Sequence, residues 1–145
     1  MDIRLSGHGS YHHEFHIVWI PKYRRNILKG ALKEFVAEHI YDIQEYHPDV
    51  EIERFSIQTD HVHLVAIIPP RYAVSDIVGK IKSNTSREVR QRFEWVKKMY
   101  WRNEFWSSGF FSSTIGINEE VIKRYVEFQE RVDKGKLPVQ LSFDF

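Results

Sequence analysis

The sequence contains no cysteine, and this absence excludes two kinds of site. Without thiols there is neither a disulfide framework nor a thiolate zinc centre, so any metal ion must be bound by histidine, carboxylate or amide side chains. Long apolar runs are also missing. The longest, residues 64–70, is far shorter than the roughly 20 residues that cross a bilayer, and no N-terminal segment has the pattern of an export signal. We therefore expect a cytoplasmic protein with no membrane partner.

Several motifs that carry phosphate or hydrolytic chemistry are absent as well. The chain has no glycine-rich phosphate-binding loop, no close pair of carboxylates in a cleft-like context and no serine in a nucleophile-elbow pattern. It also has no internal repeat, no linker and no low-complexity segment, and its 145 residues are enough to bury one core. We expect a single domain over residues 1–145.

Charge is nearly balanced overall but unevenly distributed. The net charge is +1, yet residues 80–102 contain eight Lys or Arg side chains against two Glu. Aromatic residues at positions 95, 100, 101, 105 and 106 lie in or just after this stretch. Cations for phosphates and rings for unpaired bases are what a single-stranded nucleic acid requires. The alternative is a solvated helix followed by aromatic residues of the core.

Alternation of polar and apolar residues predicts four strands. The first covers residues 12–19 and is ended by Pro21. Residues 50–58 and 61–68 alternate on either side of Thr59-Asp60, which predicts an antiparallel hairpin with a two-residue connection. Residues 110–115 form the last expected strand.

Three helices are expected between and after these strands. Residues 27–46 have apolar side chains at helical spacing and stop before a proline, because the residue before proline disfavours helical geometry. The second helix runs from an N-cap at Ser75 to about residue 93, and the third follows an N-cap at Asn118 and ends near residue 132.

The order strand, helix, strand, strand, helix, strand, helix predicts an α+β fold. It is that of a ferredoxin-like, RRM-like four-stranded antiparallel sheet with helices on one face and an additional C-terminal helix. The tail, residues 137–145, is apolar enough to dock on a partner subunit.

The segment TDHVHLV, residues 59–65, places two histidines two positions apart on a predicted strand. Side chains alternate between the faces of a strand, so His61 and His63 share one face while Val62 and Leu64 occupy the other. Two imidazoles arranged in this way can bind one divalent metal ion. Two surface histidines on a half-exposed strand are the alternative, and the pair alone does not decide between them.

The last predicted helix contributes a second pair of polar residues. Tyr125 and Gln129 are four residues apart and therefore lie on one helical face. The amide oxygen of Gln can bind a metal ion and the phenolic oxygen of Tyr can act as a nucleophile, although a lone Tyr on an amphipathic helix is also typical of a packed core residue. On the first strand, His12 and His16 share a face, and His16 is better placed to approach such a site.

Five stretches resemble the single-tyrosine HUH transposases of small bacterial insertion sequences, and the likeness covers nearly the whole chain. In order they are YHHEFHIVWIPKYRR, TDHVHLVAIIPP, VSDIVGKIKSNTSREVR, NEFWSSGFFSSTIG and VIKRYVEFQ. The family is named for two histidines that flank a hydrophobic residue, here His61 and His63 around Val62. The resemblance carries the nucleophile onto Tyr125 and the third metal ligand onto Gln129. Where family members often have Pro-Gly-Tyr after Trp-Ser, residues 106–110 read WSSGF, a departure that affects no catalytic role.

What the resemblance implies is a dimeric transposase that cleaves and rejoins single-stranded DNA and recognises imperfect hairpins near the ends of its element. A divalent ion, Mg²⁺ or Mn²⁺, held by His61, His63 and Gln129 would polarise the scissile phosphate. Tyr125 would attack it, leaving a 5′-phosphotyrosine and a free 3′-OH. One nucleophilic tyrosine per chain would mean that two ends require a homodimer, with Tyr125 acting in cis or in trans.

Basic residues in the matching stretches are candidates for contact with the DNA backbone, and a plain solvated charge is the alternative for each: Lys22, Arg24, Lys80, Lys82, Arg87 and Arg90. Two other functions fit the sequence. One is a non-catalytic module that binds single-stranded nucleic acid, because sheets of this topology commonly do so with stacked aromatic residues. The other is a domesticated HUH nickase, which oligomeric state and strand rejoining would distinguish from a transposase.

Overall fold

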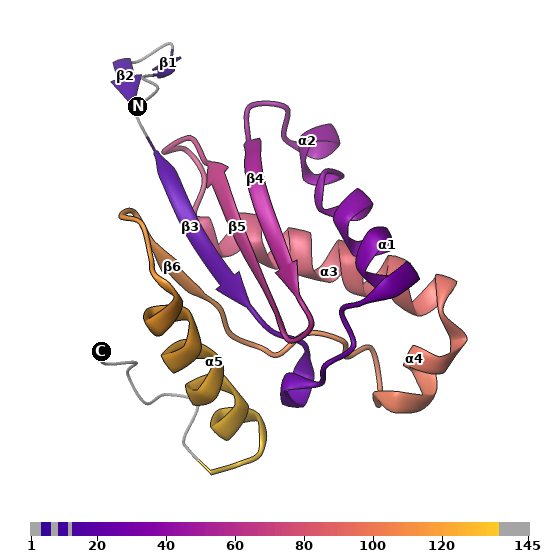
Figure 1. Ribbon diagram of the computed structural model, residues 1–145. Helices are drawn as coiled ribbons and strands as arrows, with labels where there is room; N and C mark the ends of the chain where they lie inside the picture. The colour runs from indigo at the N-terminus through magenta and orange to yellow at the C-terminus, as the bar shows by residue number, and fades with distance from the viewer. Residues whose placement is uncertain (1–3, 7–8, 12, 137–145) are drawn as a thin grey trace.

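A computed structural model of the chain describes residues 4–6, 9–11 and 13–136 (Figure 1). His12 and the tail over residues 137–145, which enter the expectations above, lie outside the described residues. Near the N-terminus, β1 (Arg4–Ser6) and β2 (Gly9–Tyr11) form a small antiparallel pair that alternation did not predict.

The main sheet has four antiparallel strands in the order β4-β5-β3-β6. The strands are β3 (Glu14–Trp19), β4 (Glu51–Gln58), β5 (His61–Ile67) and β6 (Phe111–Ser113). Gln58 of β4 pairs with His61 of β5, which confirms the two-residue connection of the hairpin. This strand order is that of the predicted ferredoxin-like sheet.

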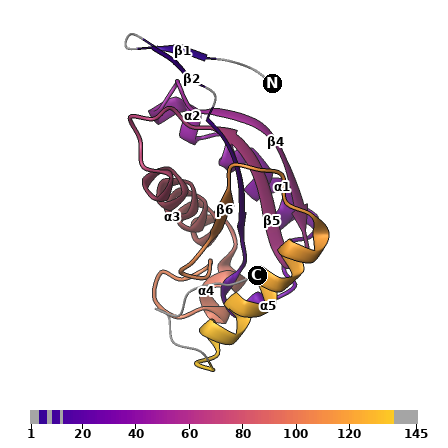
Figure 2. The same cartoon turned by 90° about the vertical axis from the view of Figure 1, so that its left-hand side faces the viewer.

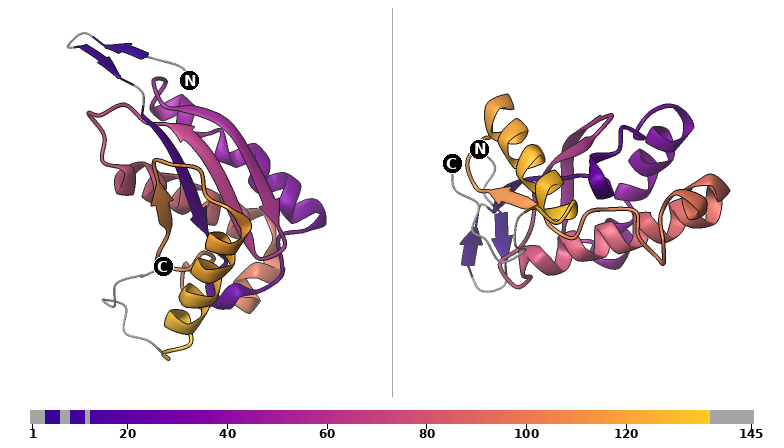
Figure 3. Two further views of the ribbon diagram at one scale, coloured as in Figure 1. Left: turned by 60° about the vertical axis from the view of Figure 1, so that its left-hand side comes forward. Right: turned by 90° about the horizontal axis from the view of Figure 1, so that it is seen from below.

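Helices cover both faces of the sheet. The helices α1 (Gly30–Ile40) and α3 (Val74–Arg92) pack on the face that carries Trp19. The C-terminal helix α5 (Glu119–Asp133) packs on the opposite face, against Val18. Figures 2 and 3 show α3 and α5 on opposite sides of the sheet. The additional helix is therefore the element that covers the second face.

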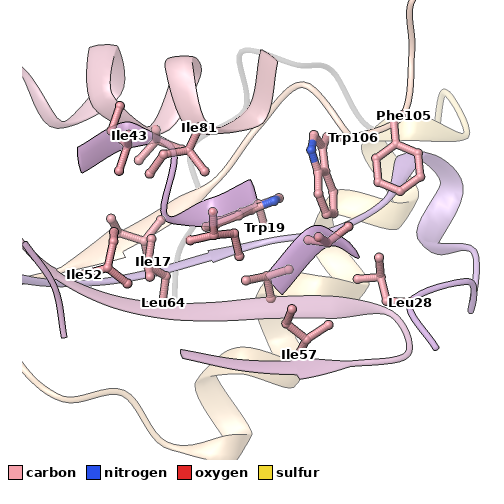
Figure 4. Close-up of a cluster of buried hydrophobic side chains, with 14 of the residues drawn as sticks. Ile17, Trp19, Leu28, Ile43, Ile52, Ile57, Leu64, Ile81, Phe105 and Trp106 are labelled. Atoms are coloured by element: carbon pink, nitrogen blue, oxygen red, sulfur yellow. The ribbon is translucent and has the colours of Figure 1, made fainter. Parts of the chain in front are cut away.

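The larger core lies between the sheet and the layer formed by α1 and α3 (Figure 4). Val62 and Leu64 of β5 point into it and are fully buried, and burying side chains of this size stabilises the fold by roughly 1.5–3 kcal/mol each. A slip of β5 by one residue would move the two histidines of this strand into the core. The apolar side chains thus fix which face the histidines occupy.

The first predicted helix is two helices in the structure, α1 and the short α2 (Ile43–Tyr46). Before α1, the Leu28 N–H donates to the Thr59 carbonyl, so this segment pairs with the turn between β4 and β5 instead of extending the helix. Between the helices, the Asp42 carboxylate accepts a hydrogen bond from Asn84 of α3 at 2.8 Å. This contact holds the segment between α1 and α2 against α3.

Helix caps match the prediction at α5 but not at α3. The Asn118 side chain accepts a hydrogen bond from the Val121 N–H at 2.9 Å, as predicted for the N-cap of α5. Ser75 is not the N-cap of α3, contrary to the prediction: the cap is Ala73, whose carbonyl accepts from the N–H groups of the first turn. A short helix that the sequence did not predict, α4 (Glu94–Met99), follows α3.

The aromatic residues near the basic stretch divide between core and surface. Tyr100, Phe105 and Trp106 are buried, whereas Trp95 is 43% and Trp101 is 84% exposed. Three of the five aromatic residues thus belong to the core, as the alternative predicted, and two remain at the surface, where binding of nucleic acid stays a prediction. No helix in the described part of the chain has the length and hydropathy of a membrane span.

Candidate active site

His61 and His63 lie on the face of β5 that points away from the larger core, as alternation predicted. Val62 between them is fully buried. His63 is the cross-strand partner of Val18 on β3, and Val18 is the residue against which α5 packs. The two histidines and α5 therefore share one face of the sheet.

Asp60 fixes the orientation of the His61 ring. Its carboxylate accepts hydrogen bonds from His61 Nδ1 and from Arg24 Nε, both at 2.9 Å. These partners, with His61 making the larger contribution, lower the pKa of Asp60 to about 2 despite its burial. A carboxylate acceptor requires the proton on Nδ1, so His61 presents the lone pair of Nε2. Metal-binding histidines are commonly oriented by a carboxylate in this way.

His63 lies beside a third imidazole, that of His16 on β3. His63 Nε2 is 3.3 Å from His16 Nδ1, and His16 is only 8% exposed. Burial lowers the pKa of His63, and the nearby His16, His61 and Arg54 lower it further. The neutral imidazole that these surroundings favour is the form that binds metal ions.

Tyr125 and Gln129 lie on the buried face of α5, where they are 2% and 5% exposed. The Tyr125 hydroxyl donates to Gln129 Oε1 at 3.3 Å. Burial raises the pKa of Tyr125, and the negative charge of Asp133 raises it further. The phenol is therefore neutral at physiological pH, and its ionisation requires a positive charge to be brought close to it.

Two sets of contacts hold α5 against the histidine face. Tyr125 belongs to a small buried cluster with Val18 of β3 and Ile20, which directly follows that strand. Further along α5, Arg24 donates from Nη1 to Glu130 at 3.1 Å while its Nε binds Asp60. The Arg24 guanidinium thus joins α5 to the Asp60 carboxylate that orients His61.

Asp133 orients the Gln129 amide. Its Oδ1 accepts from Gln129 Nε2 at 3.2 Å and from Ser107 Oγ at 2.8 Å, and its Oδ2 accepts from the Tyr23 N–H at 3.0 Å. Because the NH₂ group is committed to Asp133, the amide oxygen points toward the Tyr125 hydroxyl. This is the oxygen that a hard cation would bind.

The loop of residues 107–109 lies against the side chain of Gln129. A Cβ atom at Gly109 would lie 2.4 Å from Gln129 Oε1, so a larger residue there would force the Gln129 side chain to move. Lys82 of α3 holds the loop by donating from Nζ to the Ser107 carbonyl at 2.8 Å and to the Gly109 carbonyl at 2.9 Å. Burial lowers the pKa of this ammonium group to about 8.

Sequence reasoning missed three of these supporting residues. Asp60 directly precedes His61, and Asp133 follows Gln129 at the i, i+4 spacing that places two side chains on one helical face. Both spacings were available as signals. Gly109 carries no such signal, because its role depends on a contact between segments twenty residues apart.

The donor set fits a divalent ion of the borderline or harder kind. It consists of two imidazoles and one amide oxygen, and the ring of His61 and the amide of Gln129 are each held by a carboxylate on their other polar atom. Within the described ranges, no three His, Cys, Asp or Glu side chains gather as a metal site.

The six basic candidates differ in what their charged groups contact. Lys80 and Arg87 are exposed on α3, beside His47 and Asn84. The other four are engaged elsewhere: Lys22 with Glu104, Arg24 with Asp60 and Glu130, Lys82 with the two loop carbonyls, and Arg90 with the carbonyls of Tyr100 and Glu104. Arg87 and Arg90 also line a hollow of about 490 Å³.

Known proteins resemble this chain over almost its full length. The model of a family described as IS200-like transposases matches residues 9–129. The transposase of insertion sequence element IS200 from Salmonella typhimurium is 30% identical over 144 residues, which cover 99% of this chain and 93% of that protein. The ISDra2 transposase TnpA of Deinococcus radiodurans is 27% identical over 120 residues, covering 82% of this chain and 85% of its own.

Solved structures confirm the fold. A candidate transposase from Deinococcus radiodurans superposes with a TM-score of 0.74 at 23% identity, covering 89% of this chain and 98% of that one. A REP-associated tyrosine transposase bound to a REP hairpin superposes with a TM-score of 0.55 at 15% identity, covering 92% of this chain and 76% of that one.

Proposed function

The chain belongs to the IS200-like transposase family, and on this basis we propose that it cleaves and rejoins single-stranded DNA at the ends of an insertion sequence. Tyr125 is the nucleophile, and His61, His63 and Gln129 hold a divalent ion, Mg²⁺ or Mn²⁺. The observation that carries the proposal is the 3.3 Å hydrogen bond between Tyr125 and Gln129 on the helix that covers the histidine face.

In the proposed step the Tyr125 oxygen forms a bond to phosphorus, and the bond from phosphorus to the 3′-oxygen breaks. The phenol loses its proton and the departing oxygen gains one, which leaves a 5′-phosphotyrosine and a 3′-OH. One ester bond replaces another, so a second 3′-OH can reverse the step and join new strands without ATP. Transposition requires this reversal, because strands must be rejoined. A nickase that only cleaves does not require it.

The residues around the site prepare this step. A bound divalent ion would supply the positive charge that polarises the phosphate oxygens and favours the phenolate. Asp60 directs the Nε2 lone pair of His61, and Asp133 directs the amide oxygen of Gln129. Since that oxygen accepts the Tyr125 hydroxyl, the nucleophile is held beside a proposed ligand.

We further propose that the DNA substrate carries hairpins and that the active form is a homodimer. The solved REP-associated transposase of this fold is bound to a hairpin. With one nucleophilic tyrosine per chain, the exchange of two DNA ends requires two chains. Mixing a His61→Ala chain with a Tyr125→Phe chain decides between cis and trans action. An adduct forms in the mixture only if the intact tyrosine of one chain reaches the intact histidines of the other.

A non-catalytic module that stacks bases on its sheet is less favoured. Such modules use an open sheet face, but here α5 covers the face opposite the larger core. Among the described residues, the large aromatic side chains that are exposed lie instead outside the strands of the sheet, at Tyr23, Tyr41, Tyr46, Trp95 and Trp101.

The adduct itself is the decisive test. The purified protein is incubated with single-stranded DNA from the ends of its element, with Mn²⁺, Mg²⁺ or a chelator, and run on a denaturing gel. We expect a metal-dependent covalent band that Tyr125→Phe abolishes and that Tyr46→Phe, a change at a tyrosine 65% exposed on α2, leaves intact. An adduct that persists in Tyr125→Phe would contradict the proposed nucleophile.

A further inference from the structure

A separate hollow of about 420 Å³ lies where the turn after β3 meets the loop after α4. We call it the Trp101 pocket, and its lining includes Tyr23, Arg25, Trp101, Arg102 and Glu104. The Trp101 side chain is 84% exposed and that of Tyr23 is 39% exposed. A large indole held in water beside a second ring contributes little to the fold and is suited to a ligand with a flat apolar face.

Backbone strain is concentrated at the same place. In the described part of the chain, the non-glycine residues with positive φ are Tyr23 at 62°, Arg24 at 54° and Arg102 at 56°. Bulky residues rarely adopt this left-handed conformation, and it persists where surrounding contacts impose it, commonly at binding sites. Two of the three line the Trp101 pocket and the third adjoins it.

The pocket also has positive charge. Arg25 lies 5.8 Å from the centre of the Tyr23 ring and 5.4 Å from that of Tyr100, and both Arg25 and Arg102 are exposed. Glu104, the acidic residue among those named, is paired with Lys22 at 3.2 Å. Rings flanked by guanidinium groups, with the carboxylate neutralised, match an anionic ligand that presents π faces.

The turn that carries Tyr23 connects the pocket to the candidate active site. Arg24, the next residue, binds the Asp60 carboxylate that orients His61. The Tyr23 N–H donates to Asp133, which also orients Gln129. A DNA strand whose phosphate reaches Tyr125 would therefore have its neighbouring nucleotides near this turn.

We propose that the Trp101 pocket binds an unpaired base of the single-stranded DNA beside the cleavage phosphate. Trp101 and Tyr23 stack on the base, while Arg25 and Arg102 contact adjacent phosphates. Base stacking on aromatic side chains tolerates any sequence, so the pocket supplies affinity for single strands and not sequence recognition. The position along the strand rests on the proposed function, but the preference for unpaired bases does not.

The test measures binding without cleavage. In a Tyr125→Phe background with a chelator present, fluorescence anisotropy gives the affinity for a labelled oligodeoxythymidylate and for a blunt duplex of equal length. We expect Trp101→Ala to weaken oligothymidylate binding about tenfold and to leave duplex binding unchanged. Trp101→Phe keeps a ring and should stay close to the parent protein. Trp95→Ala, at another exposed tryptophan outside the pocket, is the matched control.

Three results would overturn the proposal. They are unchanged oligothymidylate affinity in Trp101→Ala, an equal loss of duplex affinity, and a change in the mass measured by light scattering, which would place the indole in a contact between copies. If no covalent adduct forms but Trp101→Ala still weakens binding of oligothymidylate and not of duplex, the result contradicts only the proposed role of Tyr125. The two proposals can therefore fail separately.

Discussion

At the scale of single residues, two candidate metal ligands are each oriented by a carboxylate. In both, the carboxylate binds one polar atom of the side chain and leaves the other polar atom available to a metal ion. His61 is held at Nδ1 by Asp60, and Gln129 is held at Nε2 by Asp133. Hydrogen bonds to charged groups contribute roughly 1.5–3 kcal/mol each, enough to keep the ring and the amide in one orientation. The presented atoms, Nε2 and Oε1, are therefore positioned before any ligand arrives.

Gly109→Ala tests whether the close approach of the 107–109 loop positions the Gln129 amide. The new Cβ would lie 2.4 Å from Gln129 Oε1, so the amide must move away from the Tyr125 hydroxyl. Displacements of about 1 Å cost roughly a hundredfold in rate, and crowding of this kind destabilises by about 1–3 kcal/mol. We expect adduct formation on a denaturing gel to slow by about that factor, while DNA affinity is retained.

Gly79→Ala is the matched control for that change. Gly79 lies on α3, and a Cβ there would meet nothing within 4 Å. Alanine in a helix interior should stabilise the protein by about 0.5–1 kcal/mol and leave adduct formation unchanged. Wild-type adduct formation in Gly109→Ala would show that the position of the amide does not matter.

Local periodicity identified the candidate ligands and nucleophile but not the residues that position them. The period of two in a strand placed His61 and His63 on one face, and the i, i+4 rule placed Tyr125 and Gln129 together. These rules act within one element. The contact of Gly109 with Gln129 depends on how a loop meets a helix, which no spacing within one element encodes.

At the scale of elements, α3 and α5 lie on opposite sides of the sheet but are connected through the loop of residues 107–109. Lys82 of α3 binds two carbonyls of this loop, and Asp133 of α5 binds the Ser107 hydroxyl. The loop is therefore hydrogen-bonded to both helices. The buried ammonium group of Lys82 gives this connection a dependence on pH that can be measured.

Lys82→Met should change the dependence of stability on pH. Burial lowers the pKa of Lys82 from 10.5 to about 8, so between these values the unfolded chain binds more protons than the folded protein. Stability from this group therefore rises with pH across that window, and below it the full cost of burying the charge applies. Methionine has similar bulk and no charge, so the variant lacks this rise.

Urea unfolding at several pH values measures the effect. The free energy of unfolding of the wild type minus that of Lys82→Met should increase from pH 8 toward pH 10.5. Lys80→Met, at an exposed lysine of the same helix, is the control. Parallel stability curves for wild type and Lys82→Met would show that the ammonium group is not desolvated.

Elements were predictable where local signals agree with tertiary contacts. The hairpin of β4 and β5 follows from alternation on either side of Thr59-Asp60, and the start of α5 follows from Asn118. The shift of register between Ile52 and Arg54 interrupts the alternation predicted for β4. The break after α1 was not predictable, because Asp42 is held by Asn84 from another helix. The early start of α3 was not predictable either. The N-cap at Ala73 is made by backbone groups alone, so no capping side chain indicates it in the sequence.

At the scale of the whole molecule, the two faces of the sheet have different tasks. The face toward α1 and α3 contains the larger core, while the face toward α5 contains the histidines and a small cluster. The helix α5 is thus held by a smaller apolar cluster than the one that holds α1 and α3. An ion bound between His61, His63 and Gln129 would join this helix to the sheet more firmly.

Metal binding should therefore raise the temperature of unfolding. A ligand that binds the folded state alone stabilises it by about 2.7 kcal/mol at a hundredfold excess over its dissociation constant. For a domain near 150 residues each kcal/mol shifts Tm by roughly 2–4 °C, so saturating Mn²⁺ should raise Tm by about 5–10 °C in differential scanning fluorimetry. Tyr125→Phe should keep this rise, because the tyrosine is not a proposed ligand. The double variant with His61→Ala and His63→Ala should lose it, and an undiminished rise there would place the ion elsewhere.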